Sequence, residues 1–166
     1  MHAHKYKNLF LRQSYLDSYM EYEKSLLQAS YPLWDYVVLT ASNESQARMY
    51  KEQIEYRLQA DKLSSRTHYA VLPDPDGKRV GSGGATFNAL KCIRELSNEP
   101  FKGKKILIIH SGGDSKRIPQ YSACGKLFSP IPRQLPDGRR STLFDEIIIG
   151  ITGVPARMED GMLVMS

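Results

Sequence analysis

The stretch Lys105-Ile106-Leu107-Ile108-Ile109-His110-Ser111-Gly112-Gly113 decides the fold of this chain. Its first six residues are almost purely aliphatic, and such a run is typical of a strand that is buried on both faces of a parallel sheet. The serine and two glycines that follow predict a turn with an accessible backbone. The stretch therefore predicts an α/β domain with a glycine-rich loop after a central strand.

The flanking sequence supplies the other elements of such a domain. Further strands are predicted at residues 35–40, 67–72 and 161–165. Helices are predicted at residues 8–30, from a cap at Ser42 or Asn43 to about Leu58, and at residues 87–96 and 142–151. This alternation favours a doubly wound, Rossmann-like sheet that is flanked by helices. We divide the chain into an N-terminal helical segment, residues 1–33, and the α/β domain, residues 34–166, which we expect to be truncated after its fourth strand.

Composition argues against several classes of protein. The 166 residues carry a formal charge of +5, and no window approaches the roughly 18 apolar residues that a membrane helix needs. The N-terminus lacks the pattern of a signal peptide, so we expect a cytoplasmic location. The four histidines are scattered, and Cys92 and Cys124 lack metal-binding spacing, so no zinc site is predicted. Because the basic residues do not alternate with aromatic ones, anionic small molecules explain the charge better than nucleic acid does.

The glycine-rich loop does not fit the common phosphate-binding patterns. A Walker A loop would need glycine at Gln120 and serine or threonine at Leu127. The dinucleotide fingerprint would need glycine at Thr86. Ser111 lacks the GxSxG context of a hydrolase nucleophile. The loop must therefore hold its anion in another way.

The residues after the central strand are suited to holding a polyphosphate. Gly112 and Gly113 have no Cβ, so their backbone N–H groups can approach an anion closely. Arg117 can hold two phosphate oxygens with its planar guanidinium, and Lys126 adds a compact positive charge. Transfer of a nucleotidyl group needs such a site, because the protein mainly positions the groups and neutralises charge. A second glycine cluster, residues 81–86, precedes a helix and offers free N–H donors there.

These motifs resemble the signature of the sugar nucleotidyltransferases, in which a glycine-rich loop leads to an arginine and then to a lysine. Three segments together are similar to the fucose pyrophosphorylase domain of the bifunctional L-fucokinase/GDP-fucose pyrophosphorylase family. The segments are Trp34 to Ala41, Pro73 to Thr86 and His110 to Arg117. The resemblance covers residues 34–166 and implies a nucleotidyltransferase fold of the glycosyltransferase-A type.

The resemblance also implies a reaction and a set of site residues. GTP and L-fucose 1-phosphate, with Mg²⁺, would give GDP-L-fucose and pyrophosphate. Arg117 would contact the triphosphate, and Lys126 would neutralise charge on the transferring phosphate. The nucleotide would be bound by Gly81, Ser82, Gly83, Gly84, Thr86, Gly112, Gly113, Asp114 and Lys116. No metal ligand is assigned, because the family's acidic ligand would follow residues 161–166, and we expect the 166 residues alone to be inactive.

Two other functions stay open. The parent protein would act chiefly as a sugar kinase if a kinase domain followed and this domain were degenerate. Alternatively, the domain would be a non-catalytic nucleotide-binding module, whose binding would not depend on metal or on Lys126.

Several further residues have simpler structural interpretations. Asp74 and Asp76 are expected to form a turn, and Asp145 and Glu146 to interact with a helix N-terminus. His110 is expected to be structural.

Overall fold

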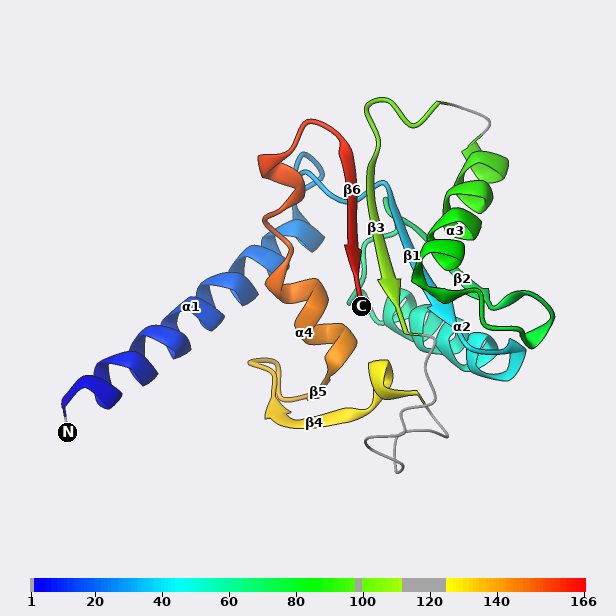
Figure 1. Ribbon diagram of the computed structural model, residues 1–166. Helices are drawn as coiled ribbons and strands as arrows, with labels where there is room; N and C mark the ends of the chain where they lie inside the picture. Colours follow the sequence, from blue (N-terminus) through cyan, green and yellow to red (C-terminus); the bar gives the residue numbers. More distant parts are fainter. Residues whose placement is uncertain (1, 98–99, 112–124) are drawn as a thin grey trace.

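The computed structural model describes residues 2–97, 100–111 and 125–166. Four parallel strands form the main sheet, in the order β2-β1-β3-β6. They are β1 (Tyr36–Ala41), β2 (His68–Pro73), β3 (Lys105–His110) and β6 (Gly161–Met165). Figure 1 shows the four arrows running in one direction, with the helices packed around them. An α/β fold with a parallel sheet flanked by helices is therefore confirmed.

The central strands are buried on both faces, as the aliphatic run of β3 predicts. Val37, Leu39 and Ala41 face a core that α2 (Glu44–Gln59) and α4 (Leu143–Gly150) complete. Tyr36 and Val38, in alternate positions, face a second core built with α3 (Gly81–Ser97). The period of two along a strand places α2 and α3 on opposite faces of the sheet.

The N-terminal helix is longer than predicted and only half packed. Helix α1 covers His2–Leu27 and extends away from the sheet (Figure 1). Tyr19 and Tyr22 are buried against Leu135 and Ile149, which anchors the second half of the helix. The helical spacing of Leu11, Tyr19, Tyr22 and Leu27 in the sequence predicts one amphipathic, packed face, but Leu11 and Leu27 are 54% and 85% exposed. The amphipathic interpretation was thus wrong at both positions.

A hairpin that the sequence did not predict follows β3. The short helix η3 (Lys126–Phe128) leads into β4 (Pro130–Gln134), which pairs antiparallel with β5 (Arg140–Thr142). Prolines at 130, 132 and 136 argue against strand structure, and this composition concealed the hairpin. The predicted helix at residues 142–151 is α4, and Thr142 caps it through a capping box with Asp145. No described helix is long and apolar enough to cross a membrane.

Candidate functional site: a cavity where the strand order reverses

The topology alone indicates where a ligand would bind. The chain passes from β1 through α2 to β2, and returns through α3 to β3 on the other side of β1. The strand order therefore reverses between β1 and β3, and the two connecting helices lie on opposite faces. In open α/β sheets, ligands bind beyond the carboxyl ends of the strands at this reversal.

A cavity of about 360 Å³ lies at that edge of the sheet. It collects residues from the ends of β1, β2 and β3, from the start of α3 and from η3. Its lining residues are Thr40, Asp74, Arg79, Gly81, Ser82, Ala85, His110, Ser111, Lys126 and Ser166. Backbone N–H groups at the start of α3 on one wall and the charge of Lys126 on the other make the cavity suitable for an anion.

His110 connects the strand ends to α3. Its Nδ1 lies 3.2 Å from the Thr40 hydroxyl, and its Nε2 lies 2.9 Å from the Thr86 hydroxyl. The Thr86 hydroxyl donates to the Ser82 carbonyl at 2.9 Å, so it can only accept from the imidazole. Nε2 must therefore carry the proton. Nδ1 then accepts from Thr40, whose oxygen also accepts from the Ser111 N–H at 3.3 Å.

All of these bonds form with a neutral imidazole. A second proton, on Nδ1, would reverse the bond to Thr40, because a hydroxyl can rotate and accept instead. Burial lowers the pKa of His110, although the Asp74 carboxylate acts in the opposite direction. His110 was expected to be structural, but it also lines the cavity. It is therefore a candidate site residue as well.

The wall that carries Lys126 is tightly packed. Gly125 has a φ of +68°, and an added Cβ would overlap the Tyr50 hydroxyl and lie 2.8 Å from Nε2 of Gln46. The buried Tyr50 hydroxyl is hydrogen-bonded to Ser111 at 2.8 Å. Tyr50 thus contacts both the residue that follows β3 and the residue that precedes Lys126.

Aromatic and charged groups pack against the buried side of this wall. Leu127 and Phe128, which follow Lys126, are buried, and the Phe128 ring packs against Phe144. The Arg57 guanidinium lies 5.0 Å from the centre of the Phe128 ring and binds Asp145 at 2.9 Å. Burial favours the neutral form of Asp145, but the hydrogen bonds and charge of Arg57, together with Thr142, keep its pKa below the ordinary value. Asp145 is therefore a structural residue, as expected.

The opposite wall is the first turn of α3. The sequence predicted a helix from residue 87, but the glycine cluster already forms its beginning, and Gly81 enters it with a φ of +69°. Gly81 and Ser82 line the cavity, whereas Gly83, Gly84 and Thr86 are not among its lining residues. A Cβ on Gly83 would meet nothing within 4 Å, so packing does not require glycine there.

The structure therefore brings together part of the predicted site. Lys126, Gly81 and Ser82 share one cavity, and Thr86 contacts it through His110. Gly83 and Gly84 are described but do not line it. The other five predicted residues lie outside the described part of the chain: Gly112, Gly113, Asp114, Lys116 and Arg117.

Sequence reasoning missed the cavity residues at the strand ends. Asp74 is more than a turn former, since its side chain lines the cavity, and Thr40 and Arg79 were not considered. Thr40 and Asp74 each lie at the carboxyl end of a predicted strand. Their position after a predicted strand could have identified them as site residues, because the carboxyl ends of parallel strands meet at one edge of the sheet.

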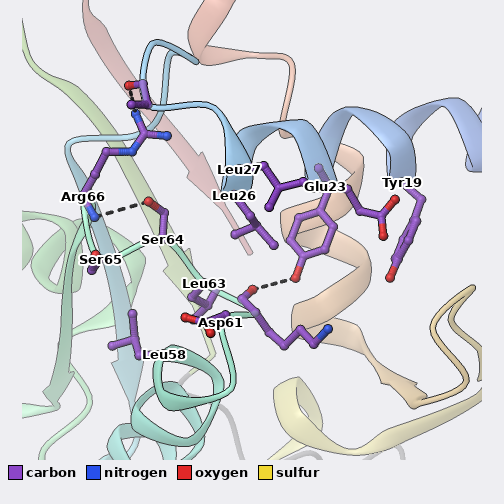
Figure 2. A pocket seen from close by; sticks show the side chains of 13 residues that line it. Tyr19, Glu23, Leu26, Leu27, Leu58, Asp61, Leu63, Ser64, Ser65 and Arg66 are labelled. Carbon is purple, nitrogen blue, oxygen red and sulfur yellow. Dashed lines mark hydrogen bonds between the residues drawn. The ribbon is translucent and has the colours of Figure 1, made fainter.

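A larger cavity, of about 600 Å³, lies between α1 and the segment 58–66, which is the end of α2 and the loop after it. Figure 2 shows side chains of α1 pointing toward this loop, where the Tyr22 hydroxyl donates to the Lys62 carbonyl at 2.6 Å. The basic side chains that line this cavity, Lys62 and Arg66, already bind other groups of the protein. Lys62 pairs with Asp137, and Arg66 donates to four carbonyls near the end of α1. These contacts attach α1 to the domain, and we assign this cavity no catalytic role.

The described residues contain no group of three or more histidine, cysteine or acidic side chains able to hold a metal ion. Asp74 has the one acidic side chain among the residues that line the cavity at the strand ends. This set does not make a protein cage for a metal. It is compatible with Mg²⁺ that is held mainly by substrate phosphates, which is the usual mode for this ion.

The fold and the cavity at the strand ends define an α/β protein with a ligand site of the Rossmann-like kind. Residues 98–166 match the family model described as the Fucose pyrophosphorylase domain. The resemblance predicted from the sequence motifs is therefore confirmed.

Relatives with curated names agree with this match. The chain is 37% identical over 131 residues to the Fucose-1-phosphate guanylyltransferase of Mus musculus, covering 79% of this chain and 22% of the relative. It is 37% identical to the Bifunctional fucokinase/GDP-fucose pyrophosphorylase of Arabidopsis thaliana, covering 70% of this chain and 13% of the relative. The L-fucokinase/L-fucose-1-P guanylyltransferase of Bacteroides fragilis is 38% identical over 74 residues, which cover 41% of this chain and 8% of the relative. The chain thus spans less than a quarter of each of these proteins, and no solved structure matches it significantly.

Proposed function

We propose that this chain contributes the nucleotide-binding part of a sugar-1-phosphate nucleotidyltransferase of the glycosyltransferase-A type. The reaction is GTP plus L-fucose 1-phosphate to GDP-L-fucose plus pyrophosphate. One observation carries the proposal: Lys126 and the start of α3 line a single cavity at the point where the strand order reverses. The names of the relatives supply the nucleotide and the sugar.

The chemistry that such a cavity must support is an in-line displacement. A phosphate oxygen of fucose 1-phosphate attacks the α-phosphorus of GTP, and a new P–O bond forms. The bond from the α-phosphorus to the oxygen that bridges to the β-phosphate breaks, and its electron pair leaves with pyrophosphate. In our proposal, Lys126 neutralises negative charge on the transferring phosphate, and Arg117 holds the triphosphate. Mg²⁺, bound by the phosphates, would neutralise further charge.

Pyrophosphate release by the full-length gene product tests this proposal. GTP, ATP, UTP and CTP are each supplied with L-fucose 1-phosphate and Mg²⁺. We expect release with GTP, and a loss of roughly 100-fold or more in Lys126→Ala, on the scale of removing one preorganised transition-state contact. The same assay on residues 1–166 alone is expected to show no turnover.

Lys91→Ala is the matched control. Lys91 is also exposed, but it lies farther along α3, within 4.0 Å of Glu95 and outside the lining of the cavity. Its substitution should leave the rate unchanged. Equal rates for both variants would contradict the role of Lys126, and silence of the folded wild type with every nucleotide would contradict the function itself.

The relatives' names also motivate a second candidate, a fucokinase in which this domain only binds nucleotide. It predicts ADP formation from ATP and free L-fucose, with no pyrophosphate from any nucleoside triphosphate.

A further inference from the structure

Asp74 is the one acidic side chain that lines the cavity at the strand ends, where Arg79 and Lys126 are the basic ones. It follows the last residue of β2, and its backbone N–H donates to the Ala41 carbonyl at 2.8 Å, which fixes it beside the end of β1. Its side chain is half-buried and lines the cavity. Within the described residues, no hydrogen bond to its carboxylate is found. Burial raises the pKa of Asp74, although Arg79 and His110 act in the opposite direction.

A carboxylate in this place does not suit the anionic part of a nucleotide. It would repel phosphate oxygens, and it is not accompanied by further described acidic side chains that could complete a metal site. Its two oxygens accept hydrogen bonds, and bonds to a charged acceptor are the stronger kind. The cavity therefore needs a ligand group with donors at the Asp74 end and negative charge at the Lys126 end.

The spacing of the strands separates these two ends. Lys126 lies near the end of β3, because the neighbouring Gly125 and Ser111 both approach the Tyr50 hydroxyl. Asp74 follows β2, and β1 lies between the two strands. Neighbouring strands are about 4.8 Å apart, so the two ends are on the order of 10 Å apart at the sheet edge. A nucleotide with its phosphates beside β3 would therefore have its sugar near β1 and its base near β2.

We propose that Asp74 is the specificity-determining residue for guanine, accepting hydrogen bonds from N1–H and the 2-amino group through its two carboxylate oxygens. This inference rests on the proposed function and names the group that selects the nucleotide. Guanine presents these two donors side by side. Adenine and cytosine each pair one amino donor with a ring acceptor, and uracil flanks a single donor with two acceptors. A carboxylate meets at least one repulsive group on each of those three.

Asp74→Asn is the variant that tests the proposal. It preserves the shape of the side chain but replaces one acceptor with an NH₂ donor. The experiment measures KM and kcat of the full-length gene product, together with the dissociation constants of GTP and ITP, which lacks the 2-amino group. We expect the wild type to bind ITP about 10-fold more weakly than GTP. We expect Asp74→Asn to raise KM for GTP about 10- to 100-fold and to bind GTP and ITP about equally.

Asp76→Asn is the matched control. Asp76 lies in the same turn at a φ of 54°, which asparagine tolerates, and it is exposed and outside the lining of the cavity. It should retain the wild-type preference for GTP. Circular dichroism and thermal melting establish that both variants are folded.

Three results would overturn the assignment of Asp74 while the proposed function stands. In the first, the variant releases pyrophosphate with an unchanged ratio of GTP to ITP. In the second, it loses discrimination between GTP and 2′-deoxy-GTP, which would place Asp74 at the ribose. In the third, it needs much more Mg²⁺ for half-maximal activity, which would place Asp74 at the metal. A folded wild type that releases no pyrophosphate with any nucleotide would instead overturn the proposed function, and this inference with it.

Discussion

The two walls of the cavity at the strand ends are built in opposite ways. The wall at residues 125–128 is packed: Leu127 and Phe128 are buried, and Tyr50 leaves no room for a Cβ on Gly125. The wall formed by Gly81 and Ser82 is exposed, and Gly83, the next residue of α3, faces open space. One wall is fixed by the core of the protein, whereas the other leaves its backbone accessible.

This difference separates two reasons for glycine in a single site. Gly125 is required by the fold, because of its positive φ and its contact with Tyr50. Gly83 has no such structural requirement. Its absence of a side chain is useful only if a ligand approaches the backbone of α3 closely. Substitutions should therefore affect stability at one wall and binding at the other.

The largest effect is expected beneath the packed wall, at Arg57. Arg57→Met should destabilise the protein by about 3–5 kcal/mol at pH 7, because the carboxylate of Asp145 would remain buried without its partner. Chemical denaturation measures the change. Arg133→Met, which breaks the exposed pair with Glu146, should cost less than about 1 kcal/mol.

The same pair has a defined pH dependence. The pKa of Asp145 is lowered in the folded state, so its stabilising contribution is complete above the ordinary aspartate pKa of about 3.9. It is lost as the pH falls through the folded-state pKa. The penalty of Arg57→Met should shrink over that acidic range, and a penalty independent of pH would contradict the charge-based explanation.

A smaller effect is expected for alanine at the two glycines. Gly125→Ala should cost roughly 2–4 kcal/mol, from the positive φ together with displacement of Tyr50. Gly83→Ala should be neutral or stabilising by up to about 1 kcal/mol, because alanine is the better helix former. Urea melts of both variants, with GTP titrations, test the contrast. If Gly83→Ala leaves GTP affinity unchanged, the nucleotide does not approach the backbone of α3 at this residue.

The smallest losses of stability are expected for variants that each remove one hydrogen bond from one of the two walls. Tyr50→Phe removes the bond to Ser111 behind Lys126, and Thr86→Val removes the acceptor for Nε2 of His110. Each should cost about 1–2 kcal/mol of stability. In the kinetic assay, we expect Tyr50→Phe chiefly to lower kcat and Thr86→Val chiefly to raise KM for the nucleotide. If Tyr50→Phe instead raised KM and Thr86→Val lowered kcat, the packed wall would bind the nucleotide and the open wall would act in the chemical step.

The sequence by itself determined the elements of the sheet. The aliphatic run at residues 105–110 predicted a buried strand, and β3 is one. Asn43 and Thr142 cap the helices that follow them, each accepting a backbone N–H of the first turn. Local signals of this kind depend on side chains close to one another in the chain, so they can be read without the fold. The prolines of the hairpin at residues 130–142 are local signals too, and they pointed away from its strands.

Only the tertiary structure decided which of these residues meet. Thr40, Asp74, His110 and Lys126 come from four separate segments, and the strand order β2-β1-β3 brings them to one cavity. The protonated nitrogen of His110 likewise follows from two threonines that lie 70 and 24 residues away along the chain. Strand order and register are fixed by packing between distant segments, and no local pattern in the sequence contains that information.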